Sequence, residues 1–331
     1  MLMQETYTYA THGIPLDLDV YIADDDFPDP SESPIFLYFH PGGLAGGSRA
    51  CIPPWLVQVC CQRKWPLISP SYRLLPQAGA KDLLEDAAAA YNFAHTWGAS
   101  VSGSKRPVIV GGSSAGFFMA TLIAYHVKPP PVALLCITGI PSFRHPFFSS
   151  SKLITPVAIK EEDIARYLDD PVEVGAIDAY DESTFHIYQI LPTGQKNVEY
   201  THPTRPATVT SNASVVSRDS LYDYWLYQNA YLDLVGDVDP GFRWAKEDKD
   251  GDKLQDWPFS IFIQGDADTD VSMDVTTHAV ECLGPDKAKL CLAQGAPHLF
   301  EAKSFLEDEP QGMAAVREAI DLLDTHLQSR L

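Results

Sequence analysis

Short apolar runs alternate with amphipathic stretches along most of this chain. The apolar runs predict strands at 6–9, 16–22, 35–39, 67–72, 107–110, 132–138, 259–263 and 289–292. From the third run onward, helix-like stretches separate the strands, at 54–63, 80–97, 115–127, 272–283 and 312–331. This alternation predicts an α/β fold, with an eight-stranded, mostly parallel central sheet and helices on both of its faces.

The stretch from 141 to 256 breaks this pattern. It holds many prolines, scattered charges and one long amphipathic candidate helix at 220–234. Loops of this length without strands are usually lids or binding elements. We therefore predict a core formed by 1–140 and 257–331, with 141–256 inserted as a cap. We expect at least half of the aromatic residues in the candidate helix to pack on the core and the rest to face a substrate: Tyr222, Tyr224, Trp225, Tyr227 and Tyr231.

A strand, a sharp turn and a helix meet at a G-x-S-x-G pattern. The run ending at Val110 leads into Gly112-Ser113-Ser114-Ala115-Gly116, and a helix-like stretch follows. Flanking glycines suit a strained turn, where larger side chains would clash with the strand and the helix. The turn lifts the hydroxyl of Ser114 to a helix N-terminus, where backbone N–H groups can face an oxyanion. A phosphate-binding loop is the alternative, but no Gly-Lys-Ser/Thr follows.

Three further polar loops follow predicted strands. The strand at 35–39 runs into His40-Pro41-Gly42-Gly43, where the glycine pair lets the backbone approach a ligand with exposed N–H groups; a flexible hairpin loop is the alternative. One later strand leads to the carboxylates Asp266, Asp268 and Asp270, and the last strand leads to His298. Ligands of parallel sheets bind beyond the carboxyl ends of the strands, so we expect these loops to converge.

Taken in this order, the motifs resemble the hormone-sensitive-lipase-like esterase branch of the α/β-hydrolase superfamily, and the resemblance covers most of the chain. His40-Pro41-Gly42-Gly43 is similar to the His-Gly-Gly-Gly motif of the branch, and Gly112–Gly116 to its Gly-Asp-Ser-Ala-Gly elbow. The segment 72–77, Tyr-Arg-Leu-Leu-Pro-Gln, followed by Glu85-Asp86, is similar to a Tyr-Arg-Leu-Ala-Pro-Glu motif and an acidic pair, with glutamine in place of glutamate. The cap and Pro41 also resemble fungal members of the branch, some of which serve natural-product pathways.

The resemblance implies a catalytic triad of Ser114, Asp268 and His298, in the chain order expected for this fold. Asp268 fits the spacing of the family's acid motif, with Gly265 before it and Val271 after it, whereas Asp266 and Asp270 do not.

The resemblance also implies the donors of an oxyanion hole. In this branch they are the N–H groups of the second and third glycines and of the residue after the serine, which correspond to Gly42, Gly43 and Ala115. Pro41 has no N–H group, but it stands where none of these donors is expected.

These groups predict a serine hydrolase that cleaves a carboxylic ester through a covalent acyl-enzyme. A serine hydroxyl needs a nearby base, and a histidine with a near-neutral pKa can shuttle its proton. The alternatives are a thioesterase, lactonase or acyltransferase that uses the same triad in natural-product biosynthesis. A further alternative is a non-hydrolytic isomerase, cyclase or ligand-binding protein on the same scaffold.

Net charge and cysteine spacing limit the kinds of partner and cofactor that we expect this protein to bind. The formal net charge of −20 argues against nucleic acid and against an anionic membrane surface, since both favour basic patches. The six cysteines show no paired metal-ligand spacing, so we interpret them as reduced core residues and expect neither a metal nor a cofactor. No signal-like run opens the chain, and no apolar stretch reaches membrane-spanning length. We expect a cytoplasmic protein with a small-molecule ester or thioester substrate, and leave homo-oligomer formation open.

Overall fold

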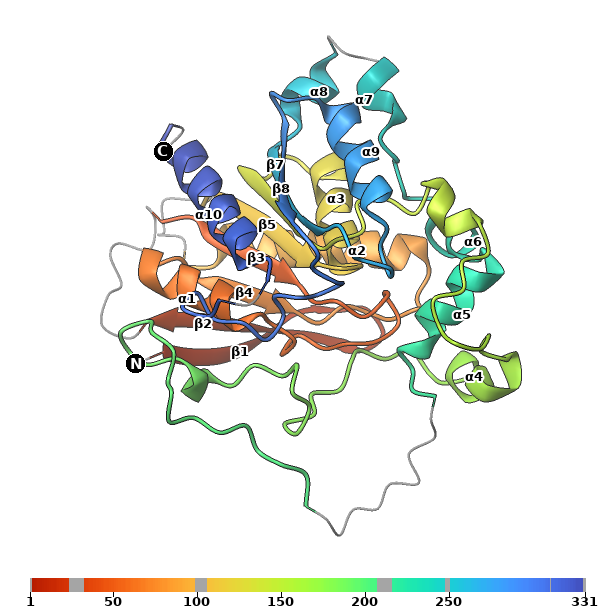
Figure 1. Cartoon of the computed structure of the whole chain (residues 1–331), viewed down its shortest axis with the longest axis horizontal. Helices are drawn as coiled ribbons and strands as arrows, with labels where there is room; N and C mark the ends of the chain where they lie inside the picture. The colour runs from red at the N-terminus through yellow and green to blue at the C-terminus, as the bar shows by residue number, and fades with distance from the viewer. Residues whose placement is uncertain are drawn as a thin grey trace.

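One eight-stranded sheet runs through the molecule (Figure 1). The computed structural model describes residues 2–23, 33–98, 106–206, 216–247, 251–309 and 311–329. The strands are β1 (Leu2–Thr11), β2 (Pro15–Ala23), β3 (Ile35–Phe39), β4 (Leu67–Pro70), β5 (Val108–Ser113), β6 (Ala133–Ile137), β7 (Phe259–Gly265) and β8 (Ala288–Ala293). Their order across the sheet is β1-β2-β4-β3-β5-β6-β7-β8. The pairs β1–β2 and β2–β4 are antiparallel and the other neighbouring pairs are parallel, which confirms the predicted sheet.

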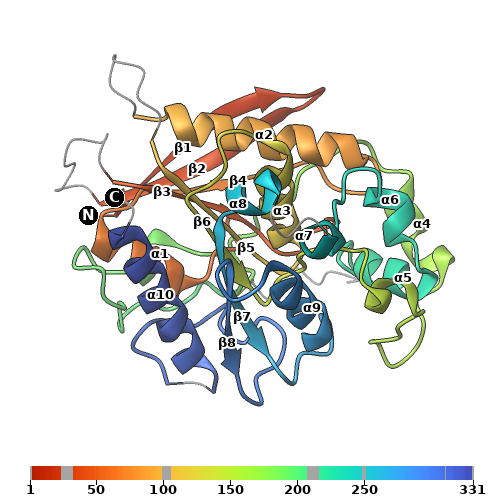
Figure 2. The same cartoon turned by 90° about the horizontal axis from the view of Figure 1, so that it is seen from above.

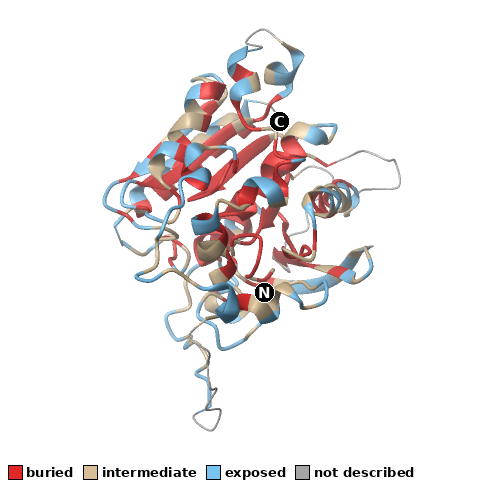
Figure 3. Ribbon diagram, turned by 90° about the vertical axis from the view of Figure 1, so that its right-hand side faces the viewer, coloured by how far each residue is buried: buried red, intermediate tan, exposed pale blue. Residues whose placement is uncertain are grey.

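Helices cover both faces of the sheet (Figure 2). One face carries α1 (Pro54–Arg63) and α10 (Met313–Gln328). The other carries α2 (Ala80–Thr96), α3 (Gly116–His126) and α9 (Met273–Leu283). With both faces covered, β3 and β6 are buried at every position, which explains why their sequences are unbroken apolar runs. Figure 3 shows that buried residues are concentrated in the strands in the interior of the molecule. The five predicted helices are all present.

The segment 141–256 contributes helices and loops but, within its described residues, no strand of the sheet. Its longer elements are α4 (Glu161–Leu168), α5 (Ser220–Gln228), α6 (Tyr231–Val235), α7 (Arg243–Glu247) and α8 (Asp252–Asp256), with short 3₁₀ turns at Pro146–Ser149 and Ile187–Gln189. Helices α4, α5 and α6 gather at one end of the molecule, whereas α7 packs against α9 (Figure 1). We refer to 141–256 as the insertion.

The single helix predicted at 220–234 is wrong. Asn229 adopts a left-handed backbone with φ of 59° and ends α5, and α6 begins two residues later at Tyr231. Asparagine tolerates this conformation better than most residues. The helix can therefore end at Asn229 even though the apolar spacing of the sequence continues past it. The break lets Trp225 and Tyr231 both become buried, while Tyr227 stays 37% exposed.

The insertion shares the core of the sheet. Leu221, Trp225 and Tyr231 belong to the same buried cluster as residues of α2 and α3. The ring of Tyr231 stacks on Phe143 with a centroid distance of 4.3 Å. Helices α5 and α6 are thus packed on the core instead of standing apart from it.

Two further sequence expectations concern membranes and cysteines. No helix in the described ranges combines the length and apolar character needed to cross a bilayer. All six cysteines are free thiols; Cys51 and Cys61 are partly exposed and the other four are buried.

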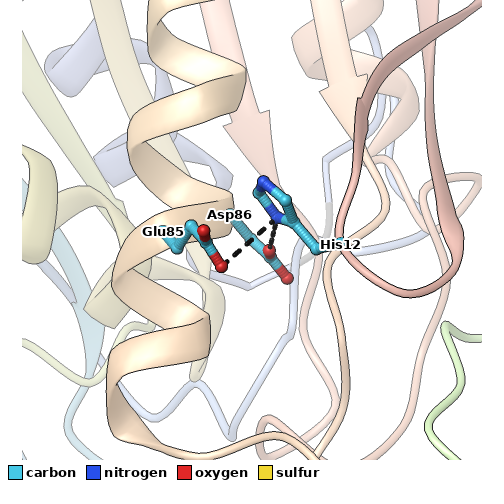
Figure 4. Close-up of side chains that lie close together, drawn as sticks. All are labelled: His12, Glu85 and Asp86. Carbon is cyan, nitrogen blue, oxygen red and sulfur yellow. Dashed lines mark hydrogen bonds and ion pairs between the residues drawn. The ribbon is translucent and has the colours of Figure 1, made fainter.

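The acidic pair of α2 binds an arginine. Asp86 is fully buried and accepts hydrogen bonds from the backbone N–H of Arg73 at 2.9 Å and from its Nε at 3.0 Å. His12 Nδ1 lies 2.7 Å from Asp86, and Glu85 accepts from Arg73 at 2.8 Å. His12, Glu85 and Asp86 carry atoms that could ligate a cation (Figure 4), but the guanidinium of Arg73 already supplies positive charge there. The group ties the loop after β4 to α2 and to the β1–β2 turn.

Removing the buried carboxylate of Asp86 should destabilise the fold. We expect Asp86→Ala to lower the free energy of unfolding by about 3–5 kcal/mol, because it leaves the buried charge of Arg73 without its main partner. Glu85→Ala is the matched control: its side chain is 56% exposed, and an exposed ion pair contributes about 0–1 kcal/mol. Chemical denaturation of both variants measures the difference. Equal losses for the two would contradict this assignment.

Candidate active site

Ser114 occupies a strained turn between β5 and α3. Its φ is 50°, in the left-handed region that non-glycine residues rarely adopt. The strand and helix approach so closely that a Cβ on Gly112 would lie 2.5 Å from the carbonyl carbon of Gly116. A Cβ on Gly116 would lie 2.2 Å from the carbonyl oxygen of Phe39 on β3. Both glycines of the pattern are therefore required for close packing.

The two adjacent serines have different surroundings. Ser113 ends β5, is buried, and accepts a hydrogen bond from the hydroxyl of Tyr38 at 2.9 Å. Ser114 Oγ instead lies 3.0 Å from Nε2 of His298. Only the second hydroxyl therefore has a base within hydrogen-bond reach.

Ser114, His298 and Asp268 form one hydrogen-bonded line. His298 comes from the loop after β8, and its Nδ1 lies 2.8 Å from Oδ2 of Asp268, which comes from the loop after β7. Because the carboxylate can only accept, Nδ1 carries the proton and the lone pair of Nε2 faces the serine. Burial lowers the pKa of His298, but the hydrogen bond and charge of Asp268 outweigh it, and the net shift is upward.

The carboxylate of Asp268 is fixed from several sides. Its Oδ1 accepts the backbone N–H groups of Asp270 at 3.0 Å and Val271 at 2.8 Å. Its Oδ2 also accepts from Nε2 of Gln264 at 2.9 Å. Asp266 instead holds the backbone N–H of Gly295. Of the three aspartates in this loop, it is Asp268 that reaches the histidine.

The loop after β3 presents backbone N–H groups. Gly42 and Gly43 have φ of 123° and 63°, and a Cβ on Gly42 would lie 2.2 Å from the carbonyl oxygen of Gly46. The N–H groups of Gly42, Gly43 and Ala115 have no acceptor among the described residues. They are therefore free to bind an anion.

His40, at the start of this loop, has a structural contact. Its ring stacks on Tyr72 at 4.2 Å, and Nδ1 lies 2.8 Å from the carbonyl oxygen of Pro41. Burial lowers the pKa of His40 to about 4. The neutral ring therefore donates to Pro41 and steadies the bend into the glycine pair.

A buried carboxyl adjoins the His298–Asp268 pair. Glu301 lies three residues after His298 and is fully buried, and neither of its oxygens has a partner from another described residue. Burial raises the pKa of Glu301 to about 7, and the charges of His298 and Asp268 act on it. An ionised carboxylate without a partner costs free energy in a buried site. Glu301 therefore stays protonated at pH values above those at which a glutamate ordinarily ionises.

Some of these contacts were not predicted from the sequence. Gln264 carried a readable signal, since it is a polar residue within an otherwise apolar strand. Glu301 and Tyr38 carried none, because their importance comes from neighbours that are distant in the chain or hidden by the fold.

A strained serine turn after the central strand β5, with an acid after β7 and a histidine after β8, defines the α/β-hydrolase fold. Residues 36–169 match a family model described as alpha/beta hydrolase fold. Among solved structures, an alpha/beta hydrolase superfamily protein from Enterococcus faecalis aligns with a TM-score of 0.63 at 14% identity, over 99% of both chains. Esterase 2 of Thermogutta terrifontis aligns with a TM-score of 0.54 at 16% identity, over 98% of this chain and 94% of that one.

Three curated relatives share parts of the sequence. Lipase 2 of Moraxella sp. (strain TA144) is 34% identical over 98 residues, which are 30% of this chain and 23% of that protein. Probable carboxylesterase M8 of Phoma sp. (strain ATCC 20986 / MF5453) is 26% identical over 109 residues, 32% of this chain and 28% of that protein. Esterase LipI of Mycobacterium tuberculosis (strain ATCC 25618 / H37Rv) is 32% identical over 108 residues, 32% of this chain and 34% of that protein.

The chain therefore spans 23% to 34% of the length of these relatives. The structural matches show the α/β-hydrolase fold that the motifs predicted, and the family model matches residues 36–169 of this chain. Relatives named lipase, carboxylesterase and esterase support the resemblance to the hormone-sensitive-lipase-like branch.

The state of Glu301 can be tested through the pH dependence of stability. Its pKa is about 7 in the folded chain against an ordinary 4.5, so folding takes up a proton between these values. The contribution of this group to the free energy of unfolding therefore falls as pH rises through that window. Relative to the wild type, Glu301→Gln should gain about 3 kcal/mol at most between pH 4.5 and 8.

Denaturation at several pH values measures this gain. Glu309→Gln is the control, since the side chain of Glu309 is 83% exposed. A stability difference for Glu301→Gln that stays constant with pH would show that the buried carboxyl does not retain its proton.

Proposed function

We propose that this chain is a serine carboxylic ester hydrolase. The observation that carries the proposal is the hydrogen-bonded line, in which His298 lies 3.0 Å from the hydroxyl of Ser114 and 2.8 Å from the carboxylate of Asp268. The free N–H groups of Gly42 and Gly43 support it further.

Acylation follows from these positions. Nε2 of His298 takes the proton of Ser114 as Oγ forms a bond to the ester carbonyl carbon. The carbonyl oxygen becomes an oxyanion, which the N–H groups of Gly42, Gly43 and Ala115 stabilise. Each well-placed donor of this kind contributes about 3–4 kcal/mol. The intermediate then collapses, the bond to the alkoxy oxygen breaks, and His298 returns the proton to the leaving alcohol.

Deacylation repeats these steps with water. His298 takes a proton from the water as its oxygen attacks the acyl carbon on Ser114. The same N–H groups stabilise the second oxyanion. Collapse releases the carboxylic acid and returns the proton to Oγ. Throughout, Asp268 holds the tautomer of His298 and stabilises the imidazolium.

An oxygen ester is the substrate class we favour, because relatives are named lipase, carboxylesterase and esterase. A thioester, a lactone or acyl transfer would use the same groups, and we keep these as alternatives. A cap role for the insertion is part of the proposal, and a cytoplasmic location stays a prediction.

Ser114 and Ser113 provide a matched test. We expect Ser114→Ala to abolish labelling by a fluorophosphonate probe and to lower the turnover of p-nitrophenyl acetate by at least about 10³-fold, because the nucleophile is lost. Ser113→Ala should keep both activities within about tenfold, since that hydroxyl pairs with Tyr38. Thioester and lactone analogues assayed in parallel identify the preferred acyl donor.

Outcomes that contradict the proposal are clear. Labelling that persists in Ser114→Ala would mean a different nucleophile. A wild-type chain that neither labels nor turns over any of the substrates would favour a non-hydrolytic role on this scaffold.

The pH profile tests the base. His298 must be neutral to accept a proton, and its pKa is raised above the ordinary 6.5. We therefore expect kcat/KM to fall on the acid side with a midpoint above 6.5. Asp268→Asn should move that midpoint to lower pH and lower kcat by about 10⁴-fold, because an amide does not hold the same tautomer.

Glu301→Gln serves as the control for this profile, because Glu301 titrates in the same range. The acid-side fall should persist in that variant. If it disappears, the titration belongs to Glu301 and not to His298.

A further inference from the structure

In the loop that carries Gly42 and Gly43, the carbonyl groups of four successive residues, 42–45, each accept a hydrogen bond. The carbonyl of Gly42 accepts the N–H groups of Ala45 at 2.9 Å and Gly46 at 2.8 Å, within the loop itself. The carbonyl of Leu44 accepts the N–H of Leu75 at 2.8 Å, from the segment after β4. We call residues 42–47 the oxyanion loop.

Further contacts of the oxyanion loop come from the insertion. The hydroxyl of Tyr231 donates to the carbonyl of Gly43 at 3.0 Å. Nε of Arg218 donates to the carbonyl of Ala45 at 2.7 Å. The carboxylate of Asp219 lies against Gly46, since a Cβ on that glycine would lie 1.7 Å from Oδ1 of Asp219.

These insertion groups are themselves well anchored. Tyr231 is fully buried. Arg218 also donates to the carbonyl of Leu75 at 2.9 Å and to Oε1 of Gln77 at 2.6 Å. The amide nitrogen of Gln77 donates to the carbonyls of Tyr167 at 2.8 Å and Leu168 at 3.1 Å, at the end of α4. An ionised glutamate, which the related motif carries at this position, could accept from Arg218 but could not donate to α4.

Helix α5 also contacts the loop after β7, which carries Asp268. The hydroxyl of Tyr222 donates to the carbonyl of Asp270 at 2.6 Å. Its Cβ is so close to the oxyanion loop that a Cβ on Gly43 would lie 2.7 Å from it. One tyrosine thus lies against both catalytic loops, and the N–H of Asp270 in turn binds Asp268.

We propose that Arg218, Asp219, Tyr222 and Tyr231 are positioning residues, through which α6, α5 and the two residues before α5 fix the N–H groups of Gly42 and Gly43. The catalytic meaning of this proposal rests on the proposed function, whereas the bracing of the loop does not. The insertion then does more than cover a substrate. A lid that only shields the site would change substrate affinity, while a brace changes the stabilisation of the oxyanion and hence kcat.

Hydrogen exchange and kinetics together test the brace. Tyr231→Phe removes one hydroxyl, and Asp219→Ala removes the carboxylate that lies against Gly46. Both should speed amide exchange in peptides that cover 42–47. Both should also lower kcat by about 10–100-fold with KM within about twofold, because small displacements of catalytic groups are costly. A transition-state analogue such as a trifluoromethyl ketone should lose affinity in step with kcat.

Two controls separate bracing from general damage. Asp219→Asn keeps the shape of the side chain that lies against Gly46 and one of its oxygens, so it should restore most of the rate. Tyr227→Phe changes a tyrosine of α5 that is 37% exposed, and it should alter neither measurement. Thermal unfolding confirms that every variant is folded.

Other results would overturn either the brace or the proposed function. Unchanged exchange at 42–47 in both test variants would overturn the brace. A raised KM with an unchanged kcat would also overturn it and leave the insertion as a lid. If the wild type neither labels nor turns over, the proposed function fails, and the exchange rates still decide whether the insertion holds the loop.

Discussion

The conformation of Ser114 depends on hydrogen bonds to the end of the neighbouring strand β6 and to the loop after it. Its N–H donates to the carbonyl of Ile137, the last residue of β6, at 3.1 Å. Its carbonyl accepts the N–H of Ile140 at 2.8 Å. A left-handed non-glycine residue costs of order 1–3 kcal/mol and persists only where its surroundings over-determine it. Here the two peptide groups are anchored to the end of β6 and to the loop after it, so the hydroxyl has a defined direction, in which the ring of His298 lies.

The order of the sheet brings those groups to one edge. Strands β3, β5, β6, β7 and β8 are consecutive neighbours and run parallel, so their carboxyl ends lie together. Backbone strain gathers at the same edge. Of the non-glycine residues with positive φ, Leu44, Ser114, Thr138 and Leu299 all follow these strands closely. Such strain marks positions where side chains and N–H groups must point away from the directions that regular structure allows.

Periodicity was sufficient to predict the sheet and its helices, because doubly covered parallel strands are apolar throughout and differ clearly from amphipathic helices. It failed at 220–234, since one asparagine can end a helix without changing the apolar spacing. The predicted site residues could be named because each follows a strand in a recognisable motif. Glu301 and Arg218 could not be predicted from the sequence, because their roles depend on surroundings that only folding creates, whereas Gln264 carried a signal as a polar residue in an apolar strand.

A glycine-rich loop needs support from outside itself. Residues 42–47 include four glycines and pair with no strand, so ordering them costs more conformational entropy than ordering most loops of this length. The segment after β4 contributes the N–H of Leu75, and the insertion contributes Tyr231, Arg218 and Asp219. The glycines that let N–H groups approach a substrate thus create the need for a second element that holds them. Under the proposed function, any change in α5 or α6 that suits a new substrate must also preserve these contacts, which would couple the substrate preference of the site to its rate.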